Sequence, residues 1–336
     1  MTPESGMLGG PLLWFLSWIY GGIVRVKAWK FAKGWASSKR LKGAVISVGN
    51  LTVGGTGKTP MVMWLAQKFT EQGKRVAILS RGYRGANGTS DEIEIMKERL
   101  GNSVAFGVGK NRYEQGRILE SQGIDIFLLD DGFQHLQLAR DVNILLMDAS
   151  RPVDCERLLP AGRLREPVSA MKRADLLVFT RTDTVAGATD AIGRLHNRPI
   201  FAASSRLLGF RLLGQDRTLL PVHAINTGPF LAFCGIGNPD AFFRNLESWH
   251  MSVKERLAFP DHHHYSGTDA RRIERKAKRA GACALVTTEK DAQNLKNVSF
   301  ENLPAYVAVI DLEIVPKDEF LRSIDRLLKT GRGVAH

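Results

Sequence analysis

A glycine-rich stretch, Val48-Gly-Asn-Leu-Thr-Val-Gly-Gly-Thr-Gly-Lys-Thr-Pro60, constrains the fold of this chain most strongly. An apolar run at residues 44–48 leads into it, and a helical pattern begins near Lys58. Strand, glycine-rich loop and helix together form the setting in which a P-loop binds phosphate. Loop amides and the helix N-terminus attract the phosphates, and a lysine adds positive charge. The stretch predicts a nucleotide-binding site; a glycine-rich turn without phosphate is the alternative.

The residues expected to bind the nucleotide are consecutive in the sequence. They are Thr52, Val53, Gly54, Gly55, Thr56, Gly57, Lys58 and Thr59. The Thr59 hydroxyl is also expected to bind Mg²⁺. Thr52 stands where the usual pattern has its first glycine, and the glycines that follow offset this departure in part.

A second apolar run, at residues 124–131, ends in two carboxylates, Asp130 and Asp131. An apolar strand that ends in aspartate is typical of the Walker B element, whose carboxylate orients Mg²⁺ or its water ligands. A P-loop followed by this element indicates a nucleotide site more strongly than either alone. Gln134 and His135 follow, so an amide and an imidazole are expected beside the metal.

Two segments with basic residues are candidates for binding a ligand. Arg81 and Tyr83 follow a predicted strand at 75–80, at the sheet edge where ligands bind in open α/β folds. Arg112 lies near the start of a predicted helix, and these three residues are candidates for contacts with anionic or sugar groups. A solvated basic loop is the alternative for the first two.

An irregular segment at residues 159–167 contains a further arginine and glutamate. It is expected to bring Arg165 toward the transferring phosphate and Glu166 toward the metal, with a surface connection as the alternative. The later element Thr180-Arg-Thr-Asp183 is similar to the base-reading element of GTP-binding proteins. It has arginine in place of the usual lysine, so it does not predict guanine.

A hairpin predicted at residues 206–222 separates this half from a second α/β pattern. In that half Asp261 precedes three histidines, which do not share a face as consecutive residues and do not predict a metal site. One histidine paired with a carboxylate for acid/base chemistry is the better interpretation. Glu289 and Asp291 begin a helix after a strand and are expected to contact the base or ribose. A capped helix start is the alternative.

The N-terminal region predicts contact with a membrane. Residues 7–24 carry no charge, and seven basic residues follow between 25 and 42. Eighteen residues is about the lower limit for a membrane span, and one proline with four glycines weakens that assignment. Tryptophans suit the headgroup level and the basic residues suit an anionic cytoplasmic leaflet. We expect a membrane-associated helix, spanning or interfacial; a core helix is the alternative.

Composition limits the remaining choices. A length of 336 residues favours two domains, and the formal charge of +13 implies an anionic partner. Three widely spaced cysteines predict neither a disulfide framework nor a zinc site, and they fit a reducing compartment.

Together these motifs resemble the tetraacyldisaccharide 4′-kinase family, the lipid A 4′-kinases of Gram-negative bacteria. They run in order from the N-terminal helix nearly to the C-terminus, and the missing first P-loop glycine is typical of the family. Besides the P-loop stretch, the matching segments are Ser80-Arg-Gly-Tyr83, Asp130-Asp-Gly-Phe-Gln-His135, Pro160-Ala-Gly162, Leu164-Arg-Glu-Pro167, Phe233-Cys-Gly-Ile-Gly-Asn-Pro239, Asp261-His262 and Thr288-Glu-Lys-Asp291.

The resemblance implies a fold and a reaction. The fold is an α/β P-loop NTPase-type parallel sheet domain at 44–204 and a smaller α/β domain at 223–336. A two-stranded linker at 205–222 joins them, and a membrane-associated helix with its basic flank occupies 1–43. The reaction is ATP- and Mg²⁺-dependent phosphorylation of the 4′-hydroxyl of a tetraacylated glucosamine disaccharide 1-phosphate lipid. It takes place at the anionic cytoplasmic face of the inner membrane, with no nucleic acid and no obligate protein partner.

The resemblance also implies residue roles. Asp91 is the expected catalytic base, paired with His262 from the other domain, so that the two meet when the domains close. The sequence around Asp91, Ser90-Asp-Glu-Ile93, departs from the family's Gly-Asp-Glu-Pro, which leaves Asp130 and Asp131 as rival bases. Lys58 and Arg165 are expected to stabilise the transferring phosphoryl group. The implied Mg²⁺ residues are Thr59, Asp130, Asp131 and Glu166, and the implied substrate residues are Arg81, Tyr83, Arg112, Gln134 and His135.

Two other classes of protein compete with this interpretation. A soluble P-loop GTPase or ATPase switch fits the element at 180–183. A nucleic-acid-binding protein fits the positive charge, but the chain lacks a recognised binding motif and its basic residues concentrate after the apolar N-terminal segment.

Overall fold

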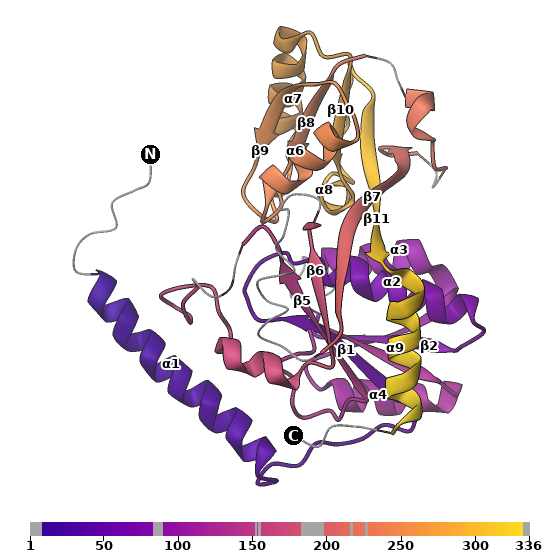
Figure 1. Cartoon of the computed structure of the whole chain (residues 1–336). Helices are drawn as coiled ribbons and strands as arrows, with labels where there is room; N and C mark the ends of the chain where they lie inside the picture. The colour runs from indigo at the N-terminus through magenta and orange to yellow at the C-terminus, as the bar shows by residue number, and fades with distance from the viewer. Residues whose placement is uncertain are drawn as a thin grey trace. The chain divides into compact units, whose positions relative to one another are not determined.

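The computed structural model of this chain describes residues 9–82, 90–151, 153, 156–182, 198–215, 218–225 and 228–331 (Figure 1). The described helices are α1 (Gly9–Ala32), α2 (Lys58–Glu71), α3 (Asp91–Leu100), α4 (Arg112–Leu119), α6 (Pro239–Ser248), α7 (Gly267–Ala280), α8 (Glu289–Asn294) and α9 (Lys317–Lys329). The described strands are β1 (Ala44–Asn50), β2 (Val76–Ser80), β3 (Val104–Val108), β4 (Ile126–Asp130), β5 (Val142–Asp148), β6 (Leu176–Thr180), β7 (Ile200–Leu212), β8 (Phe230–Cys234), β9 (Val253–Ala258), β10 (Ala284–Thr288) and β11 (Ala305–Val315).

The chain forms two compact units that are not continuous in sequence. The first comprises residues 1–82, 100–204 and 313–336, and the second comprises residues 83–99 and 205–312. Strands β7 and β11 both begin in one unit and end in the other. A hairpin closes at the predicted place, because Phe210 and Leu220 exchange backbone hydrogen bonds.

This division departs from the predicted continuous domains at two helices. Helix α3 belongs to the second unit, although it follows β2 in the sequence. Helix α9 belongs to the first unit, although its residues fall within the smaller domain predicted at 223–336. The reason for the second departure is Phe320 of α9, which is fully buried against the rings of Trp64 and Phe201.

The first unit contains a parallel sheet with the strand order β3-β2-β4-β1-β5-β6-β7. Its central strands are apolar and buried along nearly their whole length, as expected for parallel strands covered on both faces. Val48 pairs in register with Asp130, so the ends of β1 and β4 lie side by side. The P-loop and the paired aspartates therefore leave the same edge of the sheet.

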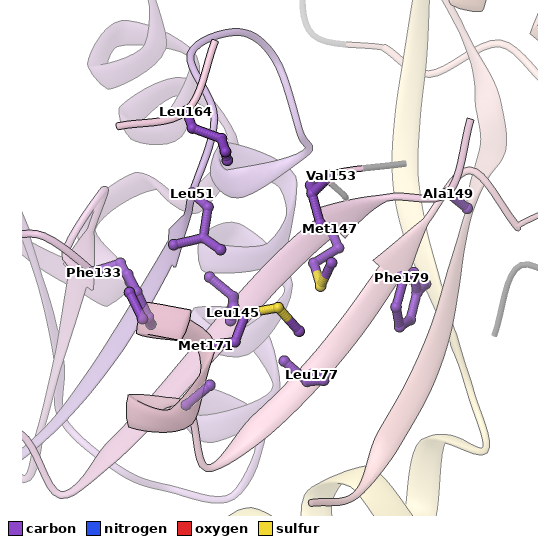
Figure 2. Packing of buried hydrophobic residues seen from close by; sticks show 12 residues of the cluster. Leu51, Phe133, Leu145, Met147, Ala149, Val153, Leu164, Met171, Leu177 and Phe179 are labelled. Atoms are coloured by element: carbon purple, nitrogen blue, oxygen red, sulfur yellow. The ribbon is translucent and has the colours of Figure 1, made fainter. Parts of the chain in front are cut away.

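A buried cluster anchors the loops that leave this edge (Figure 2). Leu51 precedes the P-loop, Phe133 follows the paired aspartates, and Leu164 precedes Arg165. All three side chains are at most 3% exposed and pack with residues of β5 and β6, such as Met147 and Phe179. Because each loop contributes an apolar side chain to one cluster, packing sets the spacing between their polar residues.

The second unit contains strands in the order β7-β11-β10-β8-β9, and the pairs β11–β10, β10–β8 and β8–β9 are parallel. The segments that follow β8, β9 and β10 therefore share one edge. Gly235 is required at this edge, because a Cβ there would lie 2.9 Å from the Pro260 carbonyl oxygen and 3.0 Å from His263 Cβ. The histidine segment and the start of α8 are thus held against the end of β8.

Helix α1 is longer than the uncharged run at 7–24 that predicted it and continues to Ala32. In the described part of the chain, no helix has the length and apolar character needed to cross a membrane. The helix nevertheless exposes large apolar side chains, including Trp18 at 75% and Ile23 at 64%. The spanning interpretation is therefore not supported, and the interfacial one stays a prediction.

Candidate active site

The P-loop of the first unit joins β1 to α2. Gly57 lies in the left-handed region with φ 85° at the N-cap of α2, and no side chain caps this helix start. The first amides of α2 are therefore left for a ligand, which is how helix N-termini bind phosphate. The buried Asn50 holds the loop by donating to the Thr56 hydroxyl at 2.8 Å. The Thr180 hydroxyl also donates to the Thr56 carbonyl at 3.2 Å.

Lys58, Asp131 and Arg165 form the charged centre of this site. Arg165 Nη1 donates to both carboxylate oxygens of Asp131, at 2.9 and 2.7 Å, and Lys58 Nζ lies 3.6 Å from Asp131 Oδ1. Burial alone raises the pKa of the Asp131 carboxyl, but the positive charges of Lys58 and then Arg165 outweigh it and lower that pKa. Asp131 is therefore ionised at neutral pH. Its φ of 49° is unfavourable for a non-glycine residue, and such strain is concentrated at functional sites.

Asp130, Arg112 and His135 form a buried group next to this centre. Ser80 Oγ donates to Asp130 Oδ2 at 3.2 Å, and Arg112 Nη2 donates to the Asp130 carbonyl at 3.4 Å. Arg112 Nη1 lies 3.3 Å from His135 Nδ1, and because arginine only donates, Nδ1 is the acceptor. Burial and then the charges of Arg112 and Arg140 lower the pKa of His135 to about 4. His135 is thus neutral at pH 7, with its proton on Nε2.

Two of the carboxylates predicted to hold Mg²⁺, Asp131 and Glu166, form ion pairs with arginines. Glu166 is 4% exposed and accepts a 2.6 Å hydrogen bond from Arg173. Among the described residues, no group of three or more histidine, cysteine, aspartate or glutamate side chains is arranged to hold a metal. Mg²⁺ beside a nucleotide needs only one or two carboxylates, because phosphates and waters complete its shell. The ionised oxygens of Asp131 next to the P-loop fit that requirement.

Helix α1 contacts the loop that carries Arg165. The Ser17 hydroxyl donates to the Leu158 carbonyl and accepts from the Ala161 amide, both at 2.9 Å. The Tyr20 hydroxyl donates to the Arg165 carbonyl at 2.8 Å. Burial, followed by the nearby Glu166 charge, raises the pKa of Tyr20, so its hydroxyl stays protonated as a donor. The helix predicted to meet the membrane therefore also positions Arg165.

A second polar group lies in the second unit. Asp91 is the first residue of α3, and its Oδ2 lies 3.2 Å from His262 Nδ1 and 3.3 Å from Asn294 Nδ2. His262 is held in the left-handed region, with φ 59°, and its amide donates to the Gly235 carbonyl at 3.1 Å. A carboxylate paired with an imidazole is the arrangement that general acid/base chemistry uses.

The carboxylates of Glu289 and Asp291 have protein partners instead of an open face. Glu289 forms ion pairs with Arg99 and Arg211. Asp291 is 1% exposed and accepts hydrogen bonds from the Gly235 amide, the Tyr265 hydroxyl and the Thr288 hydroxyl. Burial raises the pKa of Asp291, although these hydrogen bonds oppose it. Both carboxylates bind partners within the second unit, and the nucleotide contact expected of these two residues stays a prediction.

Comparison with known proteins identifies the family of this chain. The family model for tetraacyldisaccharide-1-P 4′-kinase matches residues 10–329 of this chain. The chain belongs to this family. The tetraacyldisaccharide 4′-kinase of Geobacter metallireducens is 39% identical over 336 residues, which cover 94% of this chain and 98% of that protein. The one of Geobacter sulfurreducens is 37% identical over 344 residues, which cover 96% and 95%.

A solved member of the tetraacyldisaccharide 4′-kinase family shares the fold. The crystal structure of LpxK from Aquifex aeolicus in complex with ATP has a TM-score of 0.74 and 30% identity, and covers 93% of this chain and 97% of that one. The predicted family and the P-loop α/β fold are confirmed, and the chain is an enzyme, a kinase. The rival interpretations as a GTPase switch or a nucleic-acid-binding protein are set aside.

Within this kinase the predicted site residues are divided between the two units. The first unit contains the P-loop residues, Asp130, Asp131, Arg165, Gln134 and His135, and the second contains Asp91 and His262. Gln134 is tied to the P-loop strand, because its Nε2 donates to the Asn50 carbonyl at 2.9 Å. Arg81 is exposed just after β2, and Tyr83 lies outside the described residues.

The expected assembly of the base and the histidine needs correction. Asp91 and His262 were expected on different domains, to meet only when those domains close. Both belong to the second unit, because α3 is part of it. The pair is therefore formed within one unit and does not depend on closure for its assembly.

Several residues that contact the site residues of this kinase were not predicted from the sequence. Asn50 holds both Thr56 and, at 3.4 Å, Lys58, and a polar residue at the end of an apolar strand was the available signal. Lys290 and Asn294 lie one helical turn apart on α8. Lys290 belongs to the segment Thr288-Glu-Lys-Asp291, and Asn294 follows that segment. Ser17 and Tyr20 gave no signal, because their partners are backbone groups more than 140 residues away.

Proposed function

We propose that this kinase transfers the γ-phosphate of ATP to the 4′-hydroxyl of a tetraacylated glucosamine disaccharide 1-phosphate lipid, which yields lipid IVA. The observation that carries the proposal is the centre formed by Lys58, Asp131 and Arg165 beside the uncapped start of α2. Two cations and free helix amides around one ionised carboxylate match the demands of phosphoryl transfer, which are positioning and charge stabilisation.

Each polar group has a separate task in this reaction. Lys58 and the α2 amides bind the phosphates, and Arg165 stabilises the charge that develops on the transferring group. Asp131 and Thr59 would hold Mg²⁺, which neutralises charge on the β- and γ-phosphates when bound. Asp91 accepts the proton of the 4′-hydroxyl, because a sugar hydroxyl is a weak nucleophile until its proton is removed. His262 donates to Asp91 and orients it.

Apolar surfaces in the first unit support a lipid acceptor. A pocket of about 350 Å³ lies between α1 and the short 3-10 helix at Val168–Arg173 and borders Glu166. Its lining is largely apolar and includes Val24, Ala28, Trp29, Phe31, Pro167 and Ala170. This pocket suits an acyl chain near the catalytic loop.

The outer surface of α1 supports the proposed place of work, the cytoplasmic face of the inner membrane. Exposed tryptophans at 18 and 29 on this helix, and at 35 just beyond it, suit the headgroup region. The basic residues from Arg25 to Lys42 and the charge of +13 suit an anionic leaflet.

The test is transfer of radiolabelled γ-phosphate to the purified disaccharide lipid, presented in anionic or in zwitterionic vesicles. We expect lipid-dependent transfer that is faster with anionic vesicles. Lys58→Ala is expected to lower turnover by about 10³-fold, since it removes a charge from the transition state. Lys74→Ala removes an exposed charge just beyond the same helix and is expected to keep wild-type turnover. Phosphate release at one rate with and without lipid would contradict the proposal.

A further inference from the structure

Two more charged residues continue the Asp91–His262 pair. Lys290 Nζ lies 3.3 Å from His262 Nε2, on the opposite side of the imidazole from Asp91. The same ammonium donates to Asp261 Oδ1 at 2.7 Å, and that oxygen also accepts from the His262 amide at 3.0 Å. The side chain of Lys290 is only 19% exposed, although that of His262 is 59% exposed. Asp261 therefore fixes the Lys290 ammonium beside the ring.

The chemistry of an ammonium group decides the state of His262. Lysine donates three hydrogen bonds and accepts none, so the contact at Nε2 requires an unprotonated nitrogen there. The ring proton then lies on Nδ1, where it is donated to Asp91.

We propose that Lys290 is a positioning residue that holds His262 in its neutral, Nδ1-protonated form so that Asp91 acts as the base. This inference rests on the function proposed above. With Nε2 occupied by Lys290, His262 has no site at which to accept the acceptor's proton. Both donors to Asp91, His262 and Asn294, use Oδ2. Among the described residues none hydrogen-bonds to Asp91 Oδ1, so this oxygen is the one that takes the proton.

Losing Lys290 removes the contact that fixes the tautomer of His262. The other tautomer would turn the lone pair of Nδ1 toward the carboxylate of Asp91 and repel it. This state slows proton removal without altering the residues of the P-loop, since Lys290 belongs to the second unit and the P-loop to the first.

The kinetic test is Lys290→Met, measured with both substrates and compared with Lys290→Arg and Lys296→Met. We expect kcat to fall about 10- to 100-fold with the KM values for ATP and lipid near wild type, as for a misplaced catalytic group. Lys290→Arg keeps a donor and a charge and is expected to recover most of kcat. Lys296 is exposed just beyond α8, and its replacement should have no effect.

A double-mutant cycle separates positioning from direct contact with substrate. In a His262→Ala background, Lys290→Met is expected to cause no further loss of kcat. A raised KM for ATP, or an equal loss in both backgrounds, would show that Lys290 binds substrate directly and would overturn the proposal.

The tautomer of His262 can be measured without the kinase reaction. Nitrogen-15 NMR of the wild type at neutral pH is expected to show His262 protonated at Nδ1 and unprotonated at Nε2, and Lys290→Met is expected to lose that pattern. An unchanged pattern in the variant would overturn the proposal. If the wild type fails to phosphorylate the disaccharide but shows the expected tautomer, the proposed function fails and the positioning role of Lys290 stands.

Discussion

The P-loop and the Asp91–His262 pair bring polar residues together in two different ways. The P-loop residues are consecutive, they are fixed by Asn50 and Thr180, and their anchor Leu51 is buried. Asp91 and His262 are separated by 171 residues, and the imidazole is largely exposed. The first group is thus a preformed anion site, whereas the second needs neighbouring charges such as Lys290 to define its state.

Replacing the base should separate the tasks of the two groups most clearly. Asp91→Asn keeps the size of the side chain but removes its basicity, so we expect kcat to fall about 10²- to 10⁴-fold. Binding of ATP, measured by calorimetry, should stay near wild type because the P-loop lies in the other unit. Asp240→Asn, an exposed change on α6, serves as the control. Near-normal turnover would reassign the base to Asp130 or Asp131.

Removing the Tyr20 hydroxyl tests how far the first group depends on α1. Tyr20→Phe deletes the hydrogen bond to the Arg165 carbonyl. One such bond contributes about 0.5–1.5 kcal/mol, so we expect kcat to fall about two- to tenfold if Arg165 loses its position. Tyr113→Phe on α4 is the matched control. Steady-state kinetics with unchanged kcat for Tyr20→Phe would show that the loop holds Arg165 without the helix.

The pH dependence of stability tests the buried group around His135. Its pKa is about 4 in the folded chain against an ordinary value of 6.5, so the unfolded chain binds the proton more tightly. The wild type therefore loses stability as the pH falls from about 6.5 toward about 4. His135→Asn lacks this loss, and urea unfolding midpoints should fall less between pH 7 and pH 5 than in the wild type. His223→Asn, an exposed change, should follow the wild type, and parallel curves for His135→Asn would refute the assignment.

Much of the first unit was predictable because its information is local. Apolar runs with glycine-rich or acidic ends located β1, β2, β4, β5 and β6, and the P-loop followed from consecutive residues. Helix α3 was not predicted, because the stretch from Asp91 mixes charged residues with Ile93, Ile95 and Met96, and the partners of its polar side chains lie in the second unit. Glu289 and Asp291 were predicted to contact the base or ribose, and sequence does not show that Arg99, Arg211 and Tyr265 bind their carboxylates.

The sequence by itself determined that this chain has a phosphate-binding loop, a Walker-type aspartate pair and the family to which both belong. Those features depend on neighbours in the chain, where backbone geometry and residue type suffice. Only the tertiary structure decided that Asp91 and His262 share one unit, that Lys290 stands at the far nitrogen of the ring, and that α1 holds the Arg165 loop. Each of these is a contact between distant segments, set by the packing of the strands and helices that carry them.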